Sequence, residues 1–125
     1  MPSSPPTSDL DELRKRIRAF AEAREWGQFH TPKNLAMALA VEASELMEPL
    51  QWLTAEEAAP EALSSETRFA LEDEVADIAI YLIRLADVLG VELGRAVVRK
   101  LEENEERFPV EEVRGKSRVD GRKRK

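Results

Sequence analysis

The sequence predicts an all-α protein, on the grounds of its composition and of the spacing of its apolar residues. Among 125 residues there are only 5 glycines, and charged residues make up 35% of the chain. Alanine, leucine, glutamate and arginine are frequent, and these residues lose little conformational freedom in a helix. Apolar side chains recur at alternating intervals of three and four, which is the period of one helix face. A chain of this length is expected to form one domain.

The first helix is expected over residues 9–24, after a Pro- and Ser-rich segment, residues 1–8, that is expected to be disordered. Ser8, followed three positions later by Asp11, has the form of an N-terminal capping box. Arg14, Lys15 and Arg18 are expected to face solvent, while an apolar stripe packs against the rest of the protein. That stripe consists of Leu10, Leu13, Ile17 and Phe20.

Thr31 and Pro32 mark the start of a second helix, which is expected to extend to near Trp52. A threonine side chain can cap the free amides of the first turn, where proline is tolerated because no donor is needed. Pro49 falls inside this range and removes the hydrogen bond to the carbonyl of Glu45. A kink or an early end is therefore expected there.

A third helix over residues 65–89 has the clearest pattern, and Gly90 supplies a C-terminal stop. The connection before it, residues 54–64, is expected to hold at most a short helical turn. A fourth helix is expected over residues 92–107, ending before Pro109. The apolar seam of the third helix is Leu71, Val75, Ile78, Leu82, Leu85 and Leu89. The inward positions expected for the fourth helix are Leu93, Val97 and Leu101.

These elements predict one all-α domain over residues 9–109, followed by a charged flexible tail, residues 110–125. The net charge of −6 argues against a general nucleic-acid binder, which needs a basic face. Cysteine is absent, so neither disulfides nor thiolate metal sites are expected. Neither a signal peptide nor a long apolar stretch is apparent. We therefore expect a cytoplasmic location and no association with a membrane.

Two acidic pairs carry the candidate chemistry. Glu42 and Glu45 lie in the expected second helix, and Glu74 and Asp77 lie in the third. A spacing of three places each pair on one side of its helix, so two adjacent antiparallel helices can bring four carboxylates together. Charges about 5 Å apart repel by roughly 3 kcal/mol at an effective dielectric of about 20, which favours cation binding. Oxygen ligands without thiolates or a helical Glu-x-x-His motif favour Mg²⁺ or Mn²⁺.

Each acidic pair, taken alone, is also compatible with a solvated helix face in so acidic a chain. The positions of the pairs argue for an inward orientation. Glu42 and Glu45 continue the stripe that begins at Leu35 and Ala38, and the other pair borders the seam of the third helix.

Aromatic side chains near the acidic pairs offer flat surfaces on which a base and a sugar can stack. These residues, which are also compatible with a core role, are Trp26, Phe29, His30, Trp52 and Tyr81. Lys100, Asn104 and Arg107 form a polar, cationic stripe on the fourth helix that could hold phosphate oxygens. A solvated helix face explains this stripe equally well.

Together these motifs follow one another in a distinctive order. They are Trp26 to Asn34, Glu42 with Glu45, Gln51-Trp52, Glu74 with Asp77 and Tyr81, and Lys100 through Asn104 to Arg107-Phe108-Pro109. The ordered set resembles the all-α nucleoside triphosphate pyrophosphohydrolases of the MazG-like type, most closely the dCTP pyrophosphatase branch. The resemblance covers about residues 10–118.

The resemblance implies hydrolysis of a pyrimidine dNTP, most closely dCTP, to the monophosphate and pyrophosphate. It implies that Glu42, Glu45, Glu74 and Asp77 hold Mg²⁺. It also implies that the aromatic residues named above enclose the base and deoxyribose, with Lys100, Asn104 and Arg107 on the phosphate side. The implied architecture is a four-helix bundle-like protomer assembled as a homodimer or homotetramer.

Two departures from the family pattern, Pro49 and Phe108 where a tyrosine is frequent, bear on the shape of the pocket. Two alternatives also stay open from the sequence. One is the same chemistry on dUTP or on a modified or damaged nucleotide. The other is a non-enzymatic helical interaction module whose acidic pairs are solvated and whose aromatic residues bind a protein partner.

Overall fold

The computed structural model describes residues 9–116, and the chain divides into two compact units, Met1–Val91 and Glu92–Lys125. Over the described range all regular secondary structure is helical, and no strand occurs. The prediction of an all-α fold is therefore confirmed. The expected disorder of residues 1–8 concerns a segment outside the described residues.

Helix α1 (Leu10–Ala23) begins at Asp9, whose Oδ1 accepts a hydrogen bond of 2.8 Å from the amide of Asp11. Asp9 thus provides the side-chain cap that the sequence assigned to Ser8, a residue outside the described range. Arg18 is only partly exposed to solvent, because its guanidinium donates to the carboxylate of Asp87 on a later helix. A buried acid can hold a long cationic side chain against the core, and helical periodicity does not reveal such a partner.

Helix α2 (Pro32–Met47) begins as predicted, with Thr31 Oγ1 accepting a hydrogen bond of 3.1 Å from the amide of Asn34. It ends before Pro49, which confirms the expected early end. At this end the Glu45 carbonyl accepts instead from the amide of Glu48, over 3.2 Å. Trp52 consequently lies in the turn that follows the helix.

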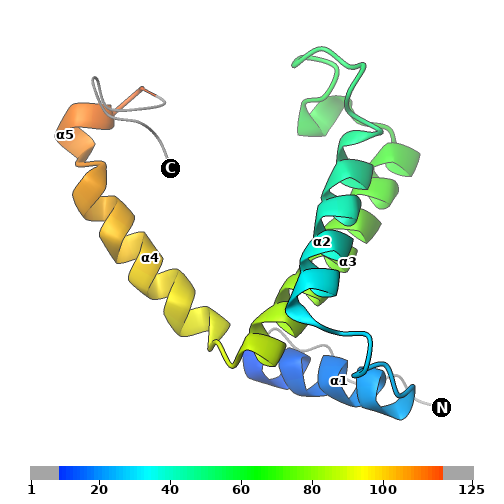
Figure 1. The fold of residues 1–125 in the computed structure, drawn as a ribbon. Coiled ribbons are helices and arrows are strands. Elements are labelled where there is room, and N and C mark those ends of the chain that lie inside the picture. Colours follow the sequence, from blue (N-terminus) through cyan, green and yellow to red (C-terminus); the bar gives the residue numbers. More distant parts are fainter. Residues whose placement is uncertain (1–8, 117–125) are drawn as a thin grey trace. The chain divides into compact units, whose positions relative to one another are not determined.

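Helix α3 (Ser65–Leu89) has the predicted bounds, and Gly90 ends it in the left-handed conformation with φ 71°. The connection before it contains the short 3₁₀ helix η1 (Pro60–Ala62), in agreement with the expected helical turn. Figure 1 shows α2 and α3 side by side and antiparallel, with α1 against α3 near its C-terminal end. This arrangement brings the acidic pairs of α2 and α3 onto facing surfaces.

The seam predicted for α3 is only partly buried. Three of its residues are half-buried, namely Leu71, Ile78 and Leu85. The other three are exposed, namely Val75, Leu82 and Leu89. The packing face of α3 also carries polar side chains. Its half-buried residues include Glu74, Asp77 and Tyr81. The buried apolar residues of the unit are few among the described residues, namely Ala21, Leu35, Ile83 and Ala86.

The second unit consists of helix α4 (Leu93–Arg107) and the one-turn helix α5 (Val110–Val113). The expected fourth helix is present, but Val97 and Leu101, expected to point inward, are exposed. Helix α5 falls in the segment predicted as a charged tail, whose last part, residues 117–125, lies outside the described residues. In the described part of the chain no helix is both long enough and apolar enough to cross a membrane.

Candidate metal centre and adjoining cavity

Three glutamates from the two long helices of the first unit form a cluster. Glu42 and Glu45 come from α2 and Glu74 comes from α3, and each side chain is half-buried. One carboxylate oxygen of each residue lies within 4.8 Å of one oxygen of both others. The antiparallel pairing of α2 and α3 and the three-residue spacing therefore produce the convergence that the sequence predicted.

The glutamate cluster contains carboxylate oxygens that no donor in the described part of the chain satisfies. Glu42 Oε2 and Glu74 Oε2 are both buried and have no hydrogen-bond partner. Contact with the Glu74 carboxyl, followed by burial, raises the pKa of Glu42, and contact with Glu42 raises the pKa of Glu45. Buried polar atoms without partners are costly, and oxygen-only donor sets suit hard divalent cations. The cluster therefore fits a divalent metal ion.

Asp77, the fourth predicted ligand, stands beside this group of three. Its negative charge contributes to the raised pKa values of both Glu42 and Glu45, so it lies within electrostatic range of the cluster. Asp77 and Glu42 also line the same cavity. The structure thus places all four predicted acids in one region, with three of them as the tight group.

The cavity beside the acids has a volume of about 250 Å³ and is formed by α1, α3, the segment before α2 and Glu42 of α2. Its aromatic and acidic lining suits a flat ring attached to a metal-bound group. The lining residues are Ile17, Phe20, Ala21, Trp26, His30, Glu42, Asp77, Ile80, Tyr81 and Arg84.

A tight turn after α1 positions the aromatic wall of this cavity. Glu25 has a positive φ of 54°, which is uncommon for a residue other than glycine. The turn lets the amide of Trp26 donate to the carbonyl of Ala21 over 3.0 Å. It also sets the Trp26 ring edge-on to Phe20, with ring centroids 5.5 Å apart. Trp26 is therefore held at the cavity by backbone geometry as well as by packing.

His30 and Arg84 form a hydrogen-bonded pair in the cavity wall. Arg84 Nε donates to His30 Nδ1 over 3.0 Å, and Arg84 itself is only 8% exposed. Burial, and then the charge of Arg84, lower the pKa of His30, so the imidazole is neutral at neutral pH. Arg84 Nη1 lies 3.4 Å from Asp87 Oδ2, and Arg18 holds the pKa of Asp87 below its usual value.

Of the residues predicted to bind a base and sugar, the structure brings Trp26, His30 and Tyr81 to the cavity. Phe29 and Trp52 are not part of its lining, and Trp52 is 86% exposed. Lys100, Asn104 and Arg107 lie on α4 in the second unit. A role for these five residues in binding substrate stays a prediction.

The sequence did not predict a place in the cavity for five of its lining residues, namely Arg84, Ile17, Phe20, Ala21 and Ile80. A signal for Arg84 was present, because it follows Asp77 by seven residues and Tyr81 by three, which places the three on one helix face. The apolar residues gave no separate signal, since an apolar residue lining a pocket has the same periodicity as one in a core.

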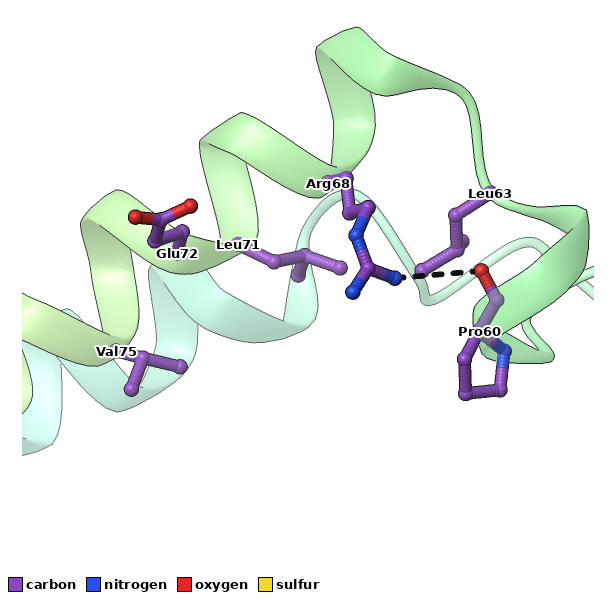
Figure 2. Close-up of a pocket in the computed structure, with 6 residues that line it drawn as sticks. All are labelled: Pro60, Leu63, Arg68, Leu71, Glu72 and Val75. Atoms are coloured by element: carbon purple, nitrogen blue, oxygen red, sulfur yellow. Dashed lines mark hydrogen bonds between the residues drawn. The ribbon is translucent and has the colours of Figure 1, made fainter.

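A second cavity of about 410 Å³ lies near the start of α3. Figure 2 shows Arg68 extending towards η1, where its Nη1 donates to the carbonyl of Pro60 over 3.4 Å. Leu63, Leu71 and Val75 supply apolar walls, and Glu72 is the one acid in the lining. A single carboxylate without neighbouring acids does not make a metal site, so this cavity is not the candidate site.

The fold and the site define an all-α protein whose glutamate cluster suits a divalent metal ion beside an aromatic cavity. The chain belongs to the MazG-like family, whose model matches residues 37–119.

Similar proteins agree with this assignment. Over 113 residues the chain is 45% identical to dCTP pyrophosphatase 1 of Bos taurus and 41% identical to that of Homo sapiens. Each match covers 90% of this chain and 66% of the relative, so the chain spans about two thirds of the length of these relatives. The crystal structure of a pyrophosphatase from Archaeoglobus fulgidus matches with a TM-score of 0.74 and 36% identity, covering 86% of this chain and 99% of that chain.

Proposed function

We propose that this chain is a Mg²⁺-dependent nucleoside triphosphate pyrophosphohydrolase that converts a pyrimidine dNTP, above all dCTP, to the monophosphate and pyrophosphate. The observation that carries the proposal is the cluster of Glu42, Glu45 and Glu74 beside an aromatic-walled cavity. The choice of dCTP as substrate rests on the similarity to the dCTP pyrophosphatases of Bos taurus and Homo sapiens.

In this proposal Glu42, Glu45, Glu74 and Asp77 hold Mg²⁺, and Mn²⁺ is a possible substitute. The two buried glutamate oxygens without partners are the natural ligand atoms. When bound, Mg²⁺ neutralises phosphate charge and makes a water molecule more acidic. An acidic site needs that positive charge before a triphosphate can approach it.

The side chains of the cavity bind and orient the nucleotide. Trp26 and Tyr81 offer faces for the base and the deoxyribose, so the α-phosphorus points towards the acids. The carboxylates orient a water molecule whose oxygen forms a bond to the α-phosphorus. The bond from that phosphorus to the bridging oxygen breaks, pyrophosphate leaves, and the proton of the water passes to solvent.

The proposal includes assembly as a homodimer or homotetramer in which the helices complete a four-helix bundle. Exposed apolar side chains support it, because large apolar patches on a single chain usually mark an interface. Such side chains occur on α2, α3 and α4, among them Met37, Val41, Val75, Leu82, Val97 and Leu101. Trp52, which is highly exposed, would then contact substrate across the interface.

The test is product analysis by chromatography after incubation with dCTP, dUTP, dTTP and CTP, each with and without Mg²⁺. Wild type is compared with Glu45→Gln, which removes one charge from the cluster, and with Glu72→Gln, an exposed acid on α3 outside it. Magnesium-dependent dCMP and pyrophosphate from wild type and Glu72→Gln, but not from Glu45→Gln, are expected.

Two other outcomes of this panel correspond to the alternatives. Faster turnover of dUTP than of dCTP would keep the chemistry and change the substrate. Absence of turnover with every nucleotide, together with no effect of Mg²⁺ on thermal stability, would contradict the enzyme proposal and favour a helical interaction module.

A further inference from the structure

The cavity has two chemically different ends. Asp77 and Arg84 both line it, and they lie seven residues apart on α3, which corresponds to about 10 Å along a helix axis. The Asp77 end adjoins the carboxylate cluster, and the Arg84 end carries the hydrogen-bonded His30. Trp26 and Tyr81 are the aromatic residues of the same lining. A nucleotide with its phosphates near the acids would therefore place its base towards Arg84.

Arg84 and His30, the hydrogen-bonded pair at this end, offer only hydrogen-bond donors to a ligand. Arginine has no acceptor, and its bonds to His30 and Asp87 use Nε and Nη1. No described residue accepts a hydrogen bond from Nη2. His30 accepts at Nδ1, so the neutral ring carries its proton on Nε2 and is a donor there.

We propose that Arg84, supported by His30, reads the N3 and O2 edge of a cytosine and so determines specificity for dCTP over dUTP. This inference rests on the proposed function and adds to it the group that selects the base. Arg84 lies outside both the sequence motifs and the acidic cluster.

The chemistry of the two bases gives the preference its direction. In cytosine N3 and O2 are adjacent acceptors, and a guanidinium can donate to both. In uracil the same ring position is N3–H, which is a donor and would face the donors of Arg84. A buried donor set rejects a ligand that presents another donor, because neither group then finds a partner.

The surroundings of Arg84 hold its guanidinium in place before a ligand arrives. Asp87, whose side chain is 6% exposed, contacts both Arg84 and Arg18. Arg18 extends from α1, so the carboxylate connects the two helices that form this end of the cavity. A group fixed in this way discriminates better than a mobile one, because it cannot turn away from a mismatched base.

The first experiment uses wild type and three triphosphates: dCTP, dUTP and the deoxynucleotide of 2-pyrimidinone. The 2-pyrimidinone ring keeps the acceptors N3 and O2 but lacks the 4-amino group. We expect its kcat/KM to stay within a few-fold of that for dCTP, and the value for dUTP to be lower by about tenfold or more. A 2-pyrimidinone substrate as poor as dUTP, or equal values for dCTP and dUTP, would overturn the inference.

The second experiment replaces Arg84. Arg84→Gln introduces a carbonyl that can accept from N3–H, so the ratio of kcat/KM for dUTP to that for dCTP should rise by about tenfold or more. A merely structural role cannot produce this gain for one base. Arg68→Gln, an arginine of the same helix outside the cavity, should leave the ratio unchanged.

The outcomes separate the inference from the proposed function. Equal losses for both bases in Arg84→Gln, in a variant that is folded by circular dichroism, would show that Arg84 supports the site without reading the base. If that variant does not fold, the comparison of the three triphosphates with wild type decides. Absence of hydrolysis by wild type with every nucleotide contradicts the proposed function, and the role of Arg84 falls with it.

Discussion

Replacing Asp87 by Asn should destabilise the first unit, because three cationic side chains contact this buried carboxylate. Arg18 Nε donates to Oδ2 over 2.8 Å, and Arg84 Nη1 lies 3.4 Å from the same atom. Arg14 Nη1 lies 3.5 Å from Oδ1. Asparagine keeps the shape of the side chain but removes its charge, and it replaces one of the two acceptor oxygens by an amide group that can only donate.

The size of the effect follows from the burial of the partners. Removing one member of a fully buried ion pair costs about 3–5 kcal/mol, and an exposed pair contributes about 0–1 kcal/mol. Asp87 is 6% exposed in its side chain, but Arg18 is 43% exposed, so an intermediate case applies. We expect a loss of about 2–3 kcal/mol in the free energy of unfolding, or about 10 °C in Tm for a chain of this size.

The pH dependence of this loss has a defined sign. Arg18 is the largest cause of the lowered pKa of Asp87. A carboxyl whose pKa is lower in the folded state stabilises the fold above its unfolded value of about 3.9, and this contribution disappears as pH falls through the folded pKa. The difference in Tm between wild type and Asp87→Asn should therefore be full at neutral pH and shrink below about pH 4.

Thermal denaturation followed by circular dichroism measures this difference across the pH range. Asp11→Asn is the matched control, because Asp11 also pairs with Arg14 but is exposed on the surface of α1. It should give no resolvable change in Tm. An Asp87→Asn variant as stable as wild type at neutral pH, or a difference in Tm that persists unchanged in acid, would refute the reasoning.

Two further predictions concern the cluster and the exposed apolar faces. Glu42→Gln should raise Tm in the presence of a chelator, because it removes repulsion from Glu74, and it should abolish the rise in Tm that Mg²⁺ gives wild type. An identical response of variant and wild type to Mg²⁺ in a thermal shift assay would contradict this. Val97→Asp should lower the molar mass measured by light scattering, because it places a charge on an exposed apolar face of α4. A monomeric wild type, or an unchanged mass for the variant, would count against the assembly.

The ends of the helices could be predicted from sequence because the residues that determine them are local. Thr31 caps α2 through its own side chain, and Gly90 adopts the left-handed conformation that ends α3. Pro49 stops α2 through a missing donor, which is equally a local effect. The packing face of α3 could not be predicted in the same way. Periodicity locates apolar residues such as Val75 and Leu82, but these are exposed, whereas polar residues such as Glu74 and Asp77 are half-buried.

The acids of the site could be predicted because their chemistry appears in pairs at helical spacing. Glu42, Glu45 and Glu74 converge as expected once α2 and α3 are antiparallel. Arg84 has only the weaker signal of sharing a helix face with Asp77 and Tyr81, and a single arginine in an amphipathic helix ordinarily faces solvent. Its burial depends on His30 and Asp87, and the distant partner Arg18 neutralises that acid.

The two charged groups of the first unit have opposite effects on stability, and this difference indicates how metal binding should act. Asp87 is surrounded by arginines and holds α1 to α3, whereas Glu42 and Glu74 repel each other across α2 and α3. Without metal, the packing of α2 against α3 is therefore weakened locally at the cluster. A divalent ion would replace that repulsion by attraction to both helices, so amide hydrogen exchange in α2 should slow on binding more than exchange in α1.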